Sequence, residues 1–144
     1  MRRAPFTVLV LPYTVELDGE VSYAVFRGRS RRDVAWHGLA GEGVRGEEPL
    51  EAARREAWRI AEVPPDALYL ALDSRRRIAA GDDEPIVEHV FAVRVCQDEV
   101  RPRRDRLAHD WVSFDIAKGR LQSQGDRDAL SELRRRIGRP ATCP

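Results

Sequence analysis

The chain has 144 residues, 42% of them hydrophobic, which suits one globular domain with its own core. Its 25 basic and 24 acidic residues leave a net charge of +1, so no overall field favours nucleic acid or a membrane surface as a partner. Cys96 and Cys143 lie far apart, without metal-site spacing or a secretory context, which favours reduced thiols in a cytoplasmic protein.

The first elements are predicted to be two strands. The opening sequence MRRAPFTVLVLPY is similar to a signal peptide, but its apolar run is short, contains Pro12 and lacks a small-residue cleavage site. Residues Phe6–Val15 and Val21–Arg27 are rich in β-formers, and Asp18-Gly19 between them is a hairpin turn signal. No segment approaches the length of a membrane span.

A glycine-rich loop is predicted next, followed by a helix. Glycine weakens the interiors of helices and strands, and four glycines lie close together. They are Gly38, Gly41, Gly43 and Gly46. The helix is expected to begin at Pro49, because proline suits the first helical position, and to end before Pro64. Its apolar stripe consists of Leu50, Ala53, Ala57 and Ile60.

The rest of the chain mixes strands with one more helix. The expected strands are Ala67–Leu72, Ile86–Val95 and Trp111–Phe114, and the second helix is Asp128–Ile137. Strands outnumber helices, and the helices are interspersed among them. This pattern favours an α+β fold in which helices sandwich a mixed sheet.

The loop and first helix carry a recognisable spacing. Gly41 is followed after five residues by Glu47, and Glu47 after seven by Arg55-Glu56, with apolar Ala57 and Val63 beyond. This pattern resembles the box of the Nudix hydrolases, which ends in Arg-Glu, an apolar residue, any residue, Glu-Glu, any residue, Gly and an apolar residue. The likeness runs from about residue 5 to residue 114 and is greatest to the bacterial dATP-pyrophosphohydrolase-like subgroup.

The resemblance implies a single Nudix domain over residues 1–144 with an α/β/α architecture. It also implies a nucleoside diphosphate-linked or triphosphate ligand, and Mg²⁺ or Mn²⁺ as cofactor if the protein is active. In such enzymes, carboxylates of the box helix bind the metal, which in turn grips the diphosphate. Many members are dimers, so a homodimer is compatible with the resemblance, although no pattern here indicates an interface.

Three positions depart from the box. Arg59 and Ile60 stand where the family has Glu-Glu, and Glu62 stands where it has Gly. Arg59 follows Glu56 by three residues on one helical face, where a guanidinium repels a cation and can pair with the carboxylate. Ile60 offers no ligand atom and suits the apolar stripe.

Carried over by position, the catalytic and metal-binding residues are Glu56, Glu47 and Glu88. Glu88 matches a Glu that related sequences keep on this strand, and a solvent-facing strand position is its equally weighted alternative. Ala108 stands where members often have another Glu, three residues before Trp111. Glu42 and Glu51 suit a solvated loop and an exposed helix face, and His37, His89 and His109 suit satisfied or exposed side chains. The arginines of Arg75–Arg77, Arg101–Arg104 and Arg134–Arg136 could contact phosphates, but solvated loops and a paired helix end are favoured.

Two functions therefore remain open. In the first, the three carboxylates hold a reduced metal set for pyrophosphohydrolysis. In the second, a nucleotide-binding or regulatory module without turnover uses Arg59 and Arg55, beside Gly41, to meet an anionic ligand without a cofactor. The resemblance equally implies a structural role for Arg55, in which it orients the neighbouring Glu56 by a charge-assisted hydrogen bond. Losing two of three helix carboxylates weakens metal binding by orders of magnitude, so we expect weak or absent hydrolysis.

Overall fold

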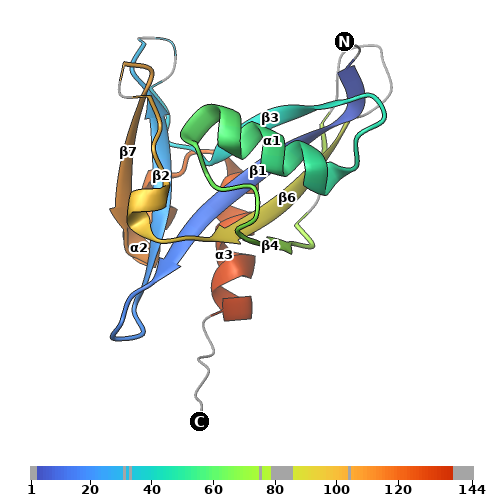
Figure 1. Ribbon diagram of the computed structural model, residues 1–144. Helices are drawn as coiled ribbons and strands as arrows, with labels where there is room; N and C mark the ends of the chain where they lie inside the picture. The colour runs from blue at the N-terminus through green and yellow to red at the C-terminus, as the bar shows by residue number, and fades with distance from the viewer. Residues whose placement is uncertain are drawn as a thin grey trace.

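A computed structural model describes residues 3–30, 32, 34–74, 76–78, 86–103 and 105–137 (Figure 1). The strands are β1 (Arg3–Val15), β2 (Val21–Gly28), β3 (Leu39–Val44), β4 (Leu68–Ala71), β5 (Arg76–Ile78), β6 (Ile86–Arg94) and β7 (Leu107–Val112). The helices are α1 (Pro49–Ala61), α2 (Phe114–Arg120) and α3 (Gln124–Ile137), with a 3₁₀ turn at Gln97–Glu99. Among these residues, no helix is both long enough and apolar enough to span a bilayer.

The described strands form one seven-stranded mixed sheet. Its main order is β4-β6-β1-β2-β7, and β1 lies at the centre. β1 and β6 run parallel, with Phe6 beside Val87 and Tyr13 beside Arg94, whereas the other pairs are antiparallel. β3 pairs with the first part of β1 and β5 with the start of β6, so these two short strands extend the same end of the sheet.

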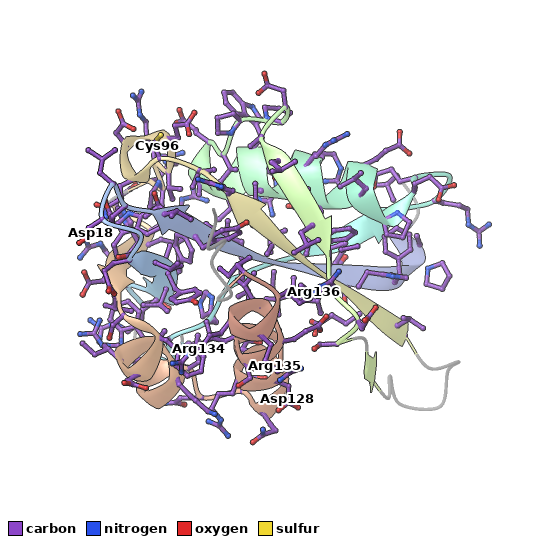
Figure 2. The ribbon with its side chains drawn as sticks, turned by 90° about the horizontal axis from the view of Figure 1, so that it is seen from below. Asp18, Cys96, Asp128, Arg134, Arg135 and Arg136 are labelled. Atoms are coloured by element: carbon purple, nitrogen blue, oxygen red, sulfur yellow. The ribbon has the colours of Figure 1, made fainter. Side chains whose placement is uncertain are left out.

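Alternate residues of β1 enter two different cores. Val8 and Val10 join the apolar cluster that also contains the alanines of α1, whereas Leu9 and Leu11 join the cluster that contains Leu130 of α3. Figure 2, seen from below, shows α1 and α3 on opposite sides of the sheet. The expected α+β architecture, a mixed sheet between helices, is confirmed.

The segment predicted to be a loop forms strand β3, so that prediction was wrong. Gly41 pairs with Val8 in the sheet. A Cβ on Gly41 would lie 2.4 Å from Cγ of Glu56, and a Cβ on Gly43 would lie 2.3 Å from Cζ of Phe6. These two glycines therefore allow close packing of the strand against its neighbours and do not form turns. A close approach of this kind is a known reason for glycine inside a strand.

Several boundaries also differ from expectation, since β1 begins at Arg3 rather than Phe6 and α3 at Gln124 rather than Asp128. The strand expected at Trp111–Phe114 is β7, which begins at Leu107 and ends at Val112. Ser113 then caps α2, because its Oγ accepts a hydrogen bond from the Ile116 amide at 3.4 Å. α2 has only seven residues, too few for a periodic apolar pattern to predict it.

Glu132 of α3 fastens that helix to the segment after β4. Its side chain is buried and accepts hydrogen bonds from the Asp73 amide at 2.7 Å, the Ser74 amide at 2.8 Å and the Ser74 hydroxyl. Arg136 adds an ion pair at 3.1 Å. Burial alone would raise the pKa of Glu132, but these hydrogen bonds outweigh it, so the pKa lies below the ordinary 4.5.

We expect Glu132→Gln to destabilise the protein by about 1–3 kcal/mol near neutral pH, because two backbone amides lose a charged acceptor. The folded-state pKa is depressed, so this stabilisation is present above the unfolded pKa near 4.5 and is lost as pH falls through the folded value. Urea unfolding at several pH values is the measurement. The wild type should lose stability more steeply than the variant below about pH 4.5, and equal slopes would contradict this role.

Candidate functional site

Helix α1 presents a polar face above the sheet edge formed by β3. Pro49 occupies its first turn, and the Glu48 amide donates to Oε1 of Glu51 at 2.8 Å, which satisfies one free amide at the helix start. The opposite, apolar face is buried in the core. It consists of Ala52, Ala53, Ala57 and Ala61, with Leu50 and Ile60 packed at its margin.

Arg55 joins the loop, the strand and the helix. Its Nε donates to Oε2 of Glu47 at 2.8 Å and its Nη2 to Oε1 at 3.0 Å, which forms a two-bond fork. Nη2 also donates to the Glu42 carbonyl at 2.8 Å, and Nη1 donates to Oε1 of Glu56 at 2.9 Å. The hydrogen bond from Arg55 lowers the pKa of Glu47, and the bonds to Glu47 and Glu56 raise the pKa of Arg55.

Glu56 lies between two guanidinium groups. Nε of Arg59 donates to Oε2 of Glu56 at 2.6 Å, and Nη2 of Arg59 lies 2.6 Å from the same oxygen. The Glu56 side chain is only 9% exposed, whereas Arg59 is 63% exposed. Gly41 lies directly against Glu56, where any larger residue would clash with it. The carboxylate is therefore fixed in position and paired on both oxygens.

The carboxylates in this arrangement do not fit a divalent cation. The oxygens of Glu47 accept hydrogen bonds from Arg55 and from the Val44 amide, and those of Glu56 accept from Arg55 and Arg59. Among the described residues, no group of three or more His, Cys, Asp or Glu side chains is placed to hold a metal. Mg²⁺ and Mn²⁺ need several oxygen ligands, so such an ion would have to displace guanidinium groups.

Glu88 lies on the other face of the sheet from Glu56. It pairs with Thr7 in the same register that places Leu9 beside Val90, and both of those residues belong to the core under α3. Residues two apart on a strand share a face, so Glu88 faces the α3 side. The side chain is buried, at 6% exposure. The structure thus gathers the predicted Glu47, Glu56, Arg55, Arg59 and Gly41 but not Glu88.

A cavity of about 380 Å³ adjoins the C-terminal half of α1. It is lined by Arg59, Ile60, Arg103, Arg106 and Leu107. The sequence suggested that the arginines around residue 103 lie on a solvated loop, and it gave no sign that they meet α1. The Arg101 amide donates to the Ala61 carbonyl at the end of α1 at 2.6 Å, and this long-range contact brings the segment to the helix.

Solved structures that superpose on this chain include Nudix proteins. A protein from Listeria monocytogenes described as a NUDIX hydrolase superposes with a TM-score of 0.80 at 25% identity, over 94% of this chain and 95% of that one. The dihydroneopterin triphosphate pyrophosphohydrolase of E. coli gives 0.71 at 16% identity, over 92% and 97%. The NUDIX domain of Shewanella oneidensis NrtR, solved with ADP ribose, gives 0.70 at 11% identity, over 95% and 90%.

Comparison by sequence gives a different kind of relative. No family model matches the chain. An octanoyltransferase from Myxococcus xanthus is 33% identical over 117 residues, which is 77% of this chain and 32% of that protein. The chain therefore spans about a third of the length of this curated relative.

The helix–sheet–helix layers and the loop and helix around Glu56 define a Nudix fold. Since the likeness to the Listeria protein covers nearly all of both chains, the chain belongs to the Nudix superfamily.

The end of α1 explains one departure from the Nudix box. Glu62 stands at the position of the box glycine and has φ +54°, in the left-handed region. Its amide donates to the Trp58 carbonyl at 2.9 Å, and the Val63 amide donates to the Ala57 carbonyl at 3.3 Å. The chain keeps the backbone turn that glycine favours and bears the strain of a side chain there.

We expect Glu62→Gly to stabilise the protein by about 0.5–1.5 kcal/mol, because glycine adopts this conformation without strain. Glu62→Ala is the matched control, since it removes the carboxylate but keeps Cβ. Chemical denaturation measures both variants. An Ala variant as stable as the Gly variant would show that charge, rather than backbone strain, limits stability at this position.

Proposed function

We propose that this protein binds a nucleotide carrying a diphosphate group, without using a metal ion, and hydrolyses it slowly or not at all. The proposal places Arg59, beside Gly41, against the anionic part of the ligand, while Arg55 holds Glu47 and Glu56 in place. Guanidinium groups bind phosphate oxygens through pairs of charged hydrogen bonds.

The ion pair between Arg59 and Glu56 carries this proposal. A divalent cation about 4 Å from a guanidinium meets a repulsion of roughly 2–8 kcal/mol, depending on the local dielectric. Arg59 is largely exposed, so solvent screens its charge and the repulsion lies in the lower part of that range. Even about 2.7 kcal/mol weakens binding a hundredfold. The same guanidinium attracts a phosphate, so one substitution disfavours the metal and favours the anion.

The fold relatives support the class of ligand. The NrtR domain was solved with ADP ribose, and the E. coli relative acts on dihydroneopterin triphosphate. Both ligands contain linked phosphates. The likeness to an octanoyltransferase does not bring acyl transfer to this chain, because about two thirds of that protein lies outside the match.

A second candidate function is weak metal-dependent pyrophosphohydrolysis. The retained fork between Arg55 and Glu47, with Glu56 next to it, favours this alternative, because it keeps the box carboxylates in place. In that case Glu47, Glu56 and Glu88 remain the proposed ligands of Mg²⁺ or Mn²⁺. Opposing it, Glu88 lies on the other face of the sheet.

Metal-independent binding is the first expected result. Calorimetry with ADP-ribose in EDTA should give a dissociation constant in the micromolar range, and adding Mg²⁺ should leave it unchanged within about twofold. Product analysis over hours should detect little cleavage. Binding that appears only with Mg²⁺, together with rapid cleavage, would contradict the proposal and favour the second candidate.

Restoring the box carboxylates should create metal-dependent activity. We expect Arg59→Glu combined with Ile60→Glu to raise Mn²⁺-dependent cleavage of ADP-ribose or a nucleoside triphosphate at least about tenfold, since two charged ligands replace a cation and an alkyl group. Arg59→Gln is the matched control, because it removes the positive charge without adding a ligand. If the double variant folds, binds Mn²⁺ and still cleaves nothing, the neighbouring pocket rather than the missing carboxylates prevents turnover.

A further inference from the structure

The cavity beside α1 is lined on its polar side by arginines from two distant segments. Arg59 comes from the helix, and Arg103 and Arg106 come from the segment before β7. Ile60 and Leu107 complete the lining, and both pack against the core under α1. Three arginine side chains therefore line one cavity together with two apolar side chains.

These guanidinium groups are only partly neutralised. Arg103 meets Asp105 at 3.5 Å with both side chains about two-thirds exposed, and an exposed pair of that length contributes little. Within the described part of the chain, no ion pair or side-chain hydrogen bond engages the guanidinium of Arg106. Arg59 uses Nε and Nη2 on Glu56, which leaves its Nη1 side for another acceptor.

The charges around the cavity favour an anion. Glu47 and Glu56 are balanced by Arg55 and Arg59, and Asp105 balances one of the two remaining arginines. One positive charge is left over at the cavity. Three arginines at one cavity supply donors for a group with several acceptor oxygens, and the planar guanidinium group matches the geometry of phosphate.

The size of the cavity restricts what part of a ligand it holds. Its volume of about 380 Å³ lies near the lower end of the range of roughly 300–1,000 Å³ typical of small-molecule pockets. A phosphate or diphosphate fits such a space, with a neighbouring apolar group against Ile60 and Leu107. A complete dinucleotide would extend beyond it along α1.

We propose that Arg59, Arg103 and Arg106 form a metal-free seat for the diphosphate of the bound ligand. Arg59 then bridges Glu56 and a phosphate oxygen, so that a guanidinium takes the bridging role that a cation has between carboxylate and diphosphate. This proposal rests on the proposed function and adds to it the residues and the charge that recognise the ligand.

The test measures binding of inorganic pyrophosphate and, separately, of ADP-ribose, by calorimetry in buffer with EDTA. Arg103→Gln and Arg106→Gln should each weaken pyrophosphate binding by roughly tenfold, since each removes a charge-assisted contact. Arg94→Gln is the matched control, because Arg94 is an exposed arginine of β6 outside the cavity lining. Circular dichroism should show all variants folded, since the replaced side chains are exposed. Raising the salt concentration should weaken binding to the wild type more than to either cavity variant.

The outcomes distinguish failure of the arginine seat from failure of the proposed function. If ADP-ribose binds the wild type and the cavity variants equally, the arginine seat is overturned while nucleotide binding stands. If pyrophosphate binds in an arginine-dependent way but no nucleotide binds, the seat stands and the proposed function fails. Absence of both interactions overturns both proposals, and binding that requires Mg²⁺ overturns the metal-free seat.

Discussion

The arrangement around the site depends on one buried carboxylate, that of Glu56. A carboxylate with so little exposure is tolerated only when it is paired and hydrogen-bonded, and Arg55 and Arg59 provide that pairing. Gly41 makes the room, since a side chain there would overlap Glu56. Removing either arginine would leave part of a buried charge without a partner. Gly41, Arg55 and Arg59 therefore cannot be replaced independently of Glu56.

This constraint also decides which chemistry the site favours. Arg55 serves the structure whether or not a ligand binds, because it ties Glu47, the Glu42 carbonyl and Glu56 into one unit. Arg59 is different, because its exposed guanidinium occupies the solvent side of Glu56. The strand, loop and helix around Glu56 are thus held by Arg55, while Arg59 places a positive charge beside that carboxylate. A positive charge there alters ligand preference without altering the fold.

Much of this fold follows from local patterns, and the rest requires tertiary contacts. The helix at residues 49–61 was predictable because its apolar spacing, its first-turn proline and the following prolines agree. β3 was mispredicted because the need for Gly41 arises from Glu56, fifteen positions later, and no local rule contains that contact. Sequence placed Glu56 and Arg59 together, since three residues separate them on a helix. It could not place Glu88 on the opposite face, because strand pairing sets that position. It could not bring Arg103 to α1 either, because a long-range hydrogen bond from the Arg101 amide to the Ala61 carbonyl joins that segment to the helix.

The central claim is that Arg59 holds the position that a metal would need beside Glu56. Titration of Mn²⁺ into the wild-type protein, followed by electron paramagnetic resonance of the free ion, tests this most directly. The account predicts no site tighter than the millimolar range, because both oxygens of Glu56 are already paired with guanidinium groups that the ion would have to displace. A site of micromolar affinity that disappears in Glu56→Gln would contradict it.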